Sequence, residues 1–312
     1  MDNKALYRQF CAEEKDMPLF IKDWWLDAVC CDWDVVLVKK GDRIAGAWPY
    51  KVEKKMNVTL LRDQVLTPYW GPYVAYPHDL KHSKRDNFQH ETITALLEQL
   101  PKVQYMYVSL FPGLKQVGLF KDNGLEVNTR QTFIMPLEER IDNVFDKLHE
   151  DYRRNVRKAE AELEIEDEPA LLKDLWEYQK ATLDGKDVRM HFSLEQLQSA
   201  FDACKQHDCT ALWVARKGGE VQAILWHLWD DKHAYYLVGS KNPASKNNRA
   251  MTALIWHAIT ESKLRDKLSF DFEGSMDPGV EKFFRNFGGN RELYLVIQKN
   301  TSLLWKLKSL LR

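Results

Sequence analysis

The chain has 312 residues, 45% of them hydrophobic and 29% charged, which is typical of a folded globular protein and argues against disorder. Its 45 lysines and arginines balance 46 acidic residues to a net charge of -1, so the molecule has no general attraction for nucleic acid or an anionic membrane. This length favours two domains over one.

The five cysteines are odd in number and lack regular spacing, which fits free thiols in a reducing compartment. Cys204, His207 and Cys209 offer only three ligands at irregular spacing, so we expect no metal site. The amino terminus lacks the basic and apolar regions of a signal peptide. No apolar run approaches the roughly 20 residues of a spanning helix. We therefore expect a cytoplasmic protein without integral membrane association.

The first half of the chain predicts a hairpin, a strand, a helix and another strand. The hairpin turns at Gly41 and Asp42, between two runs of alternating apolar residues. In chain order, the elements are hairpin strands over 34–40 and 43–51, a tyrosine-rich strand near 69–76, an amphipathic helix over 87–100 and a strand over 104–111. A short helix ending in Asn-Gly and a further strand follow over 117–135.

The second half repeats this order of elements. Its members are hairpin strands over 210–216 and 220–229, a strand over 234–240, a helix over 249–265, a strand over 268–273 and a helix followed by a strand over 281–297. Such a repeat predicts an α/β (α+β) fold with two similar domains in tandem, each a mixed twisted sheet flanked by helices. We place the domains at 1–138 and 139–312.

A single helix is predicted over 141–163, where apolar residues recur at helical spacing. Arg153, Arg154 and Arg157 lie on its other faces. Clustered arginines suit the binding of a phosphate or another anionic substrate group. Acidic neighbours could instead pair with them on a solvated surface, where each ion pair is worth at most about 1 kcal/mol. Both interpretations remain open.

The strand over 268–273 carries the strongest catalytic candidates. Strand alternation puts Asp271 and Glu273 on the same face. An ionised carboxylate in so apolar a strand is costly unless it is paired or faces a cleft. The two acids therefore either anchor the structure or serve a site. Glu273, next to Gly274, is the preferred general base.

Other candidates lie on neighbouring elements. His227 is a second possible base, or a hydrogen-bonded core residue, and Tyr236 either protonates a leaving thiolate or packs. Arg189 lies in a loop between two predicted helices, where substrate sites are common. Lys282 and Arg285 follow the carboxylate strand and could bind a phosphate or a substrate carboxylate, although an exposed helix face explains them equally.

Three motifs carry a family resemblance: YRRNVRKAE at 152–160, DFEG at 271–274 and FFRNFGG at 283–289. With them, the whole chain resembles the FemAB-like branch of the GNAT superfamily. The resemblance implies tandem GNAT-like domains, with the active site in the second, and transfer of an acyl or aminoacyl group to an amine. Named members use aminoacyl-tRNA to build peptidoglycan cross-bridges, and others resemble acyl-CoA-dependent N-acyltransferases.

The chain departs from typical GNAT enzymes at the donor loop. Those enzymes hold pyrophosphate with an Arg/Gln-x-x-Gly-x-Gly/Ala loop, whereas residues 241–254 read KNPASKNNRAMTAL without glycine. Asn247, Asn248 and Arg249 remain candidates for binding a donor phosphate at the start of the following helix.

We therefore expect an N-acyltransferase that moves an acyl group from acyl-CoA, such as acetyl-CoA, to an amine on a small molecule or peptide. An aminoacyl-tRNA-dependent peptidyltransferase acting on a peptidoglycan precursor is the first alternative, although the near-neutral charge does not favour tRNA. The second alternative is a non-catalytic GNAT-like binding module that has lost its donor loop.

Overall fold

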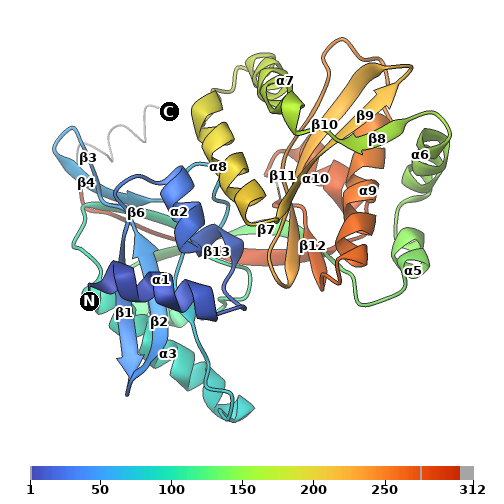
Figure 1. Ribbon diagram of the computed structural model, residues 1–312. Helices are drawn as coiled ribbons and strands as arrows, with labels where there is room; N and C mark the ends of the chain where they lie inside the picture. The colour runs from blue at the N-terminus through green and yellow to red at the C-terminus, as the bar shows by residue number, and fades with distance from the viewer. Residues whose placement is uncertain (1, 275, 303–312) are drawn as a thin grey trace. The chain divides into compact units, whose positions relative to one another are not determined.

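The computed structural model describes residues 2–274 and 276–302, which form two compact units (Figure 1). The first unit comprises Met1–Arg130 and resumes at Leu293, and the second comprises Gln131–Glu292. These limits differ from the predicted boundary at 138/139. The reason is that β13 (Asn290–Asn300) leaves the second unit and pairs with β6 (Tyr105–Ser109) of the first. The end of the described chain therefore belongs to the first unit.

The first unit contains a small antiparallel sheet with strand order β1-β2-β5. The predicted hairpin is confirmed, since β1 pairs with β2 around Gly41, which has a φ of 65°. Helices α1 and α3 pack against this sheet. The elements are α1 (Asn3–Glu13), η1 (Leu19–Ile21), α2 (Asp23–Val29), β1 (Asp34–Lys40), β2 (Arg43–Tyr50), β5 (Tyr73–Val74), α3 (His82–Gln99) and α4 (Val117–Asp122).

The other strands of the first unit follow the order β3-β4-β6-β13. β3 (Glu53–Lys55) is antiparallel to β4 (Val58–Arg62), whereas β4 and β6 are parallel. The loop after β4 closes the carboxyl end of this parallel pair. Both carboxylate oxygens of Asp63 accept hydrogen bonds from Ser109, at 2.8 and 2.6 Å, and the Trp70 amide donates to the Ser109 carbonyl at 2.7 Å. Burial raises the pKa of Asp63 to about 6.

The second unit has a mixed sheet with strand order β7-β12-β11-β10-β9-β8, which confirms the predicted fold class. β11 and β12 are parallel, and the other neighbours are antiparallel. The strands are β7 (Glu126–Pro136), β8 (Glu164–Asp167), β9 (Thr210–Lys217), β10 (Glu220–Trp229), β11 (His233–Lys241) and β12 (Ser269–Asp271).

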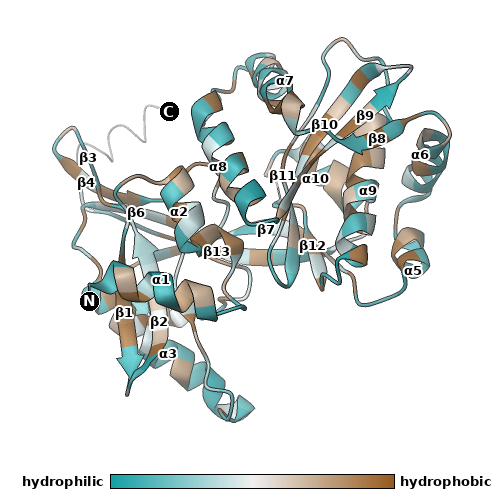
Figure 2. Cartoon of the chain, viewed as in Figure 1, coloured by the Kyte–Doolittle hydropathy of each residue, from teal (hydrophilic) through white to brown (hydrophobic). Residues whose placement is uncertain are grey.

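Helices cover both faces of this sheet. α9 (Ala250–Leu264) packs against β9, β10 and β11 and is itself covered by α6, so it is buried around most of its circumference. α7 (Leu172–Asp184) and α8 (Leu194–Gln206) lie against the sheet on the side away from α9 (Figure 1). Figure 2 shows apolar stretches along β9 and β10, which contribute much of this core. The remaining helices are η2 (Pro169–Leu171) and α10 (Pro278–Arg285).

The prediction of one helix over 141–163 is wrong, because the chain forms α5 (Ile141–Asp146) and α6 (Glu150–Glu160). His149 is extended between them, with φ -55° and ψ 144°. Its ring accepts a hydrogen bond from the Asp151 amide at 3.3 Å, and its own amide donates to the Asn286 carbonyl at 2.8 Å. A new helix therefore starts at Glu150, with His149 as its cap.

Within residues 2–274 and 276–302, no helix is both long and apolar enough to cross a lipid bilayer. The same residues contain no group of three or more histidines, cysteines, aspartates or glutamates placed to hold a metal ion.

Candidate active site

The parallel strands β11 and β12 separate at the position of the predicted acids. Their last register pair joins Tyr235 to Asp271, where β12 ends, whereas β11 continues to Lys241. The carboxyl ends of parallel strands are where α/β sheets open their binding clefts. In the first unit, the equivalent position between β4 and β6 is closed by Asp63 and Trp70. This difference favours the second unit as the reactive one.

A β-bulge in β11 exposes backbone groups at the same position. Trp226 of β10 lies opposite Val238, and His227 lies opposite Tyr236, so Leu237 has no counterpart on β10. Leu237 also lies beyond the last register pair with β12. Bulges commonly redirect groups next to active sites. Leu237 therefore has no register partner on either neighbouring strand.

Asp271 is a buried acid with structural partners, only 4% exposed. Its Oδ1 accepts hydrogen bonds from the Thr132 hydroxyl at 2.5 Å and from the Glu273 amide at 2.8 Å. These bonds tie the end of β12 to β7 and to the turn that follows. Of the two interpretations of the acid pair, this geometry supports an anchor for Asp271.

Glu273 lies in a strained turn with φ 57°, followed by Gly274 with φ 58°. β12 ends at Asp271, so strand alternation does not extend to Glu273. The turn therefore determines the position of Glu273 next to Asp271. The Glu273 Oε1 is shielded from solvent and has no hydrogen-bond partner among the described residues. Burial, together with the charge of Asp271, raises the pKa of Glu273 well above its ordinary value.

Tyr236 completes the group that the structure brings together. Its hydroxyl donates to the Gly239 carbonyl at 3.2 Å, and its ring packs edge-on against Phe284. Burial and the nearby charge of Glu273 raise the pKa of Tyr236, so the phenol stays protonated. A Cβ atom on Gly239 would lie 2.5 Å from the Tyr236 hydroxyl, so any larger residue there would displace this ring.

His227 is a neutral core residue with no exposed surface. The Trp213 indole donates to Nδ1 at 3.2 Å, so the hydrogen of the ring lies on Nε2, which donates to the Ser262 hydroxyl at 2.9 Å. Burial, and secondarily Arg265, lowers the pKa of His227 to about 3. Of its two interpretations, this geometry supports the hydrogen-bonded core residue.

We predict that His227→Leu preserves transfer activity and reduces the loss of folding stability as the pH falls. Between pH 6.5 and about 3, the unfolded chain binds a proton that folded His227 does not. Stability therefore falls as the pH falls, by at most about 1.4 kcal/mol per pH unit for this group. Urea unfolding at several pH values measures the slope, and the exposed His191→Leu serves as control. An unchanged slope in His227→Leu would contradict the prediction.

The predicted phosphate ligands at the start of α9 have partners within the protein. The Arg249 guanidinium contacts Glu162 Oε2 at 2.8 Å, and the Lys217 ammonium contacts the same oxygen at 2.9 Å. Asn247 Oδ1 accepts the Arg249 amide at 2.8 Å, and Asn248 Oδ1 accepts from Lys241 at 3.2 Å. The Glu162 carboxylate thus forms ion pairs with both Lys217 and Arg249 near the start of α9.

The loop before α9 also uses its own backbone amides internally. The amides of residues 242, 244, 245, 247 and 249 each donate a hydrogen bond within the protein. The acceptors are the carbonyls of Gln222 and Asn242 and the side chains of Asn242, Ser245 and Asn247. A pyrophosphate cradle needs amides that point at the ligand. These five amides therefore do not point at a ligand, which agrees with the missing glycines, whereas the first turn of α9 has no side-chain cap.

The remaining predicted cations lie on α6, in the loop between α7 and α8, and on α10. Arg153 donates to the Asp146 carbonyl at 3.1 Å, Arg154 pairs with Asp151 at 2.5 Å, and the Arg157 guanidinium lies 5.3 Å from the centre of the Phe145 ring. The others are exposed: Arg189 in the loop between α7 and α8, and Lys282 and Arg285 on α10, where Arg285 pairs with Glu281 at 3.5 Å. Local partners thus explain much of this cluster.

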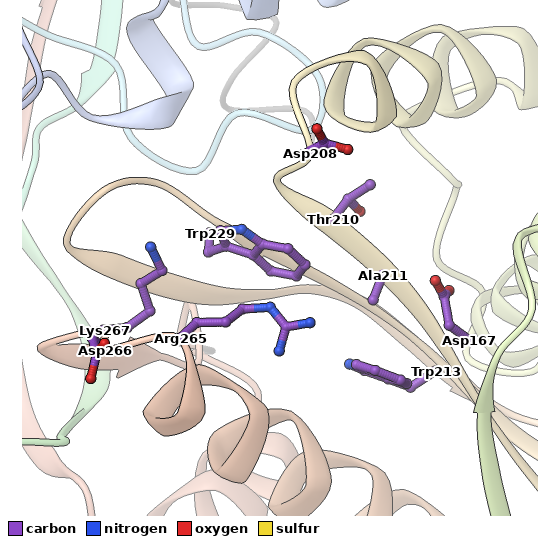
Figure 3. Close-up of a pocket in the computed structure, with 9 residues that line it drawn as sticks. All are labelled: Asp167, Asp208, Thr210, Ala211, Trp213, Trp229, Arg265, Asp266 and Lys267. Carbon is purple, nitrogen blue, oxygen red and sulfur yellow. The ribbon is translucent and has the colours of Figure 1, made fainter.

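An open pocket of about 580 Å³ lies at the other end of the same sheet (Figure 3). Arg265 points into it between Trp213 and Trp229, with its guanidinium 4.6 Å from the centre of the Trp229 ring. Lys267, in its lining, precedes β12, so the pocket adjoins the amino end of that strand. Glu273 follows the carboxyl end. The pocket contains none of the predicted site residues.

Sequence reasoning missed Thr132 and the backbone of Leu237. Thr132 is fully buried and lies 139 positions before Asp271, so no local pattern links the two. The bulge at Leu237 has no glycine or proline to mark it. Gly274, in contrast, was visible in the DFEG motif as a residue suited to a positive φ.

Comparison with known proteins agrees with this architecture. Residues 146–285 match the family model described as an acetyltransferase (GNAT) domain, which includes Tyr236, Asp271 and Glu273. A search of curated proteins found no significant match.

Three solved structures share the fold over nearly the whole chain. FemX aligns with a TM-score of 0.70 and 12% identity, covering 98% of both chains. The carboxy-terminal domain of a protein assigned as a lysylphosphatidylglycerol synthetase, from Agrobacterium fabrum, aligns with a TM-score of 0.62 and 12% identity, covering 99% of this chain and 96% of that one. A tandem GNAT protein from the clavulanic acid biosynthesis pathway aligns with a TM-score of 0.50 and 9% identity, covering 96% and 94%. Residues 146–285 therefore match a GNAT acetyltransferase domain and the chain shares the fold of FemX, which agrees with the predicted resemblance and supports a GNAT-type transferase.

Proposed function

We propose that the second unit transfers an acyl group to an amine, with Glu273 as the general base. The observation that carries this proposal is the shielded Glu273 Oε1, which has no hydrogen-bond partner among the described residues. A buried acceptor atom without a partner costs stability and calls for a functional explanation. A carboxylate whose pKa is raised is also a stronger base for an amine proton near neutral pH.

In this mechanism, the amine nitrogen attacks the carbonyl carbon of the donor and Glu273 accepts the proton that the nitrogen loses. The Leu237 amide stabilises the negative charge that develops on the carbonyl oxygen. The carbon–sulfur or carbon–oxygen bond of the donor then breaks. Tyr236, which remains protonated because its pKa is raised, donates the proton that the leaving group needs. Glu273 has then gained one proton and Tyr236 has lost one, and transfer of a proton from Glu273 to Tyr236, directly or through solvent, restores both groups.

The donor loop favours aminoacyl-tRNA over acyl-CoA as the acyl donor. Five loop amides and one guanidinium nitrogen of Arg249 bind protein groups, which argues against a preformed pyrophosphate cradle. An aminoacyl ester fits the FemAB-like resemblance and the name of the lysylphosphatidylglycerol synthetase. Acyl-CoA remains the second candidate, because the family model describes an acetyltransferase. Both donors are cytoplasmic, and the proposed acceptor is an amine on a cell-wall precursor or a small molecule.

A parallel transfer assay tests the reaction. Radiolabelled acetyl-CoA and mixed radiolabelled aminoacyl-tRNAs are each incubated with the protein and a lysine-containing UDP-linked sugar peptide or a small amine. We expect label in the acceptor as an amide, with a rate that rises with pH as Glu273 loses its proton. Absence of amide product from both donors, with all acceptors, would refute the proposal.

We predict that free coenzyme A raises the melting temperature by less than about 1 °C at millimolar concentration. A ligand at 100 times its dissociation constant would add about 2.7 kcal/mol, which corresponds to several degrees. Differential scanning fluorimetry measures the shift, with a coenzyme A-dependent GNAT enzyme as positive control. A shift of several degrees would show that the loop reorganises around the cofactor and would restore acyl-CoA as the leading donor.

A further inference from the structure

We infer that Thr132 and Asp271 form a positioning pair that fixes the Glu273 carboxylate in the reaction site without contacting the reacting atoms. The inference rests on the proposed role of Glu273 as general base. It gives a function to Thr132, and it assigns Asp271 a role distinct from that of a second catalytic acid.

The pair connects β7 to the turn that carries Glu273. Thr132 has no exposed surface, and its hydroxyl donates to Asp271 Oδ1 at 2.5 Å. The same oxygen accepts the Glu273 amide at 2.8 Å. Because a charged acceptor strengthens both bonds, the orientation of the Asp271 carboxylate determines the orientation of the Glu273 peptide.

The turn needs this support because its backbone is unfavourable. Glu273 has φ 57°, a conformation that non-glycine residues adopt only when surrounding contacts impose it. Gly274 continues the turn with φ 58° and packs against Gln131, where an added Cβ would lie 2.1 Å from the carbonyl oxygen. The Phe272 amide also donates to the Phe133 carbonyl at 3.0 Å. Residues 131–133 of β7 thus form a template for the turn.

This template explains how an unpartnered carboxylate stays shielded. A fixed peptide plane fixes the Cα–Cβ direction of Glu273 and so restricts the position of its shielded Oε1, which has no partner among the described residues. A mobile turn would let the side chain reach solvent. Two titratable neighbours are electrostatically linked to Glu273: the charge of Asp271 acts on Glu273, and the charge of Glu273 acts on Tyr236 of β11. Asp271 therefore affects both the place and the basicity of Glu273.

The two members of the pair differ in charge, and this difference separates their effects on the pH profile. Thr132→Val removes a hydrogen bond and keeps the Asp271 charge. Asp271→Asn removes the like charge that raises the pKa of Glu273, so the rise of kcat with pH should move to lower pH. Thr132→Ser keeps the hydroxyl and serves as the conservative control.

The experiment measures kcat, KM and the pH dependence of kcat for the full chain and these three variants. We expect Thr132→Val to lower kcat at least about tenfold with KM within about twofold, since small displacements of a reacting group can cost up to about 100-fold. Thr132→Ser should keep most of the wild-type kcat. Asp271→Asn should lower kcat and shift its rise to lower pH.

Direct titration of Glu273 provides a readout that is independent of turnover. Carbon NMR of glutamate-labelled protein, assigned by the loss of one signal in Glu273→Gln, should give a lower pKa in Asp271→Asn than in the parent. A Thr132→Val protein with unchanged kcat, or an Asp271→Asn protein with an unchanged Glu273 titration, would overturn the inference. Full activity in Glu273→Gln would instead refute the proposed base, whatever the other variants do.

Discussion

Replacement of Glu273 by glutamine should abolish most transfer activity and at the same time stabilise the fold. Glutamine keeps the shape of the side chain but cannot accept the amine proton, so kcat should fall by about 10²–10⁴, the usual contribution of a general base. Removal of a shielded acid without a described partner should add about 1–3 kcal/mol to the free energy of unfolding above the titration of Glu273. Loss of function with gain of stability is a signature of a catalytic group.

The stability gain should depend on pH with a definite sign. The folded-state pKa of Glu273 is raised above the ordinary value of 4.5, so in the interval between them folded Glu273 keeps a proton that the unfolded chain has lost. The free energy of unfolding of the parent therefore falls as the pH rises through that interval. Glutamine does not titrate. The two proteins should have similar stability near pH 4 and should diverge as the pH rises.

Urea unfolding across this pH range, together with single-turnover transfer, measures both effects. Glu261→Gln is the matched control, because Glu261 is a partly buried glutamate that pairs with Arg265 away from the turn. That variant should retain activity and, because it loses the ion pair with Arg265, should not be more stable than the parent. A Glu273→Gln protein that transfers at the parental rate, or that is less stable than the parent at pH 8, would contradict the assignment.

The order of elements was predictable because local signals mark it. Both hairpins turn at glycines with positive φ, Gly41 in one and Gly218 in the other, between runs of alternating apolar residues. Such signals depend only on neighbouring residues. The division at 141–163 was not predictable in this way, since the extended His149 is held by a carbonyl of Asn286, far along the chain.

The candidate site was predictable in part for the same reason. The sequence pointed to Glu273 and Asp271 as neighbours, although the cause assigned to this was strand alternation and the structure places them together through a turn. The partner that holds the turn, Thr132, lies on a strand that meets β12 only in the folded chain. The donor loop shows the opposite case, because its missing glycines already indicated that it would not cradle pyrophosphate.

Gly274→Ala should have the second large effect, because it distorts the turn without altering any titratable group. An alanine Cβ would lie 2.1 Å from the Gln131 carbonyl oxygen and 2.7 Å from the Thr132 Cα, so either β7 or the turn must move. The positive φ of 58° adds about 1 kcal/mol for any residue with a Cβ. We expect a loss of more than about 2 kcal/mol in stability and, in the folded protein, a loss of about 100-fold in kcat.

Alanine substitutions at two other glycines distinguish the backbone cost from the steric cost and from the effect on kcat. Gly218 has φ 57° and open space around it, so Gly218→Ala should show the backbone cost alone, about 1 kcal/mol, with kcat unchanged. Gly288 has φ 81°, and its added Cβ would lie 2.2 Å from the Lys147 carbonyl oxygen, so Gly288→Ala repeats the steric conflict at another position. Its stability should fall as in Gly274→Ala, while kcat per folded molecule stays near the parental value. Equal losses of kcat in both variants would mean that the turn has no special role in holding Glu273.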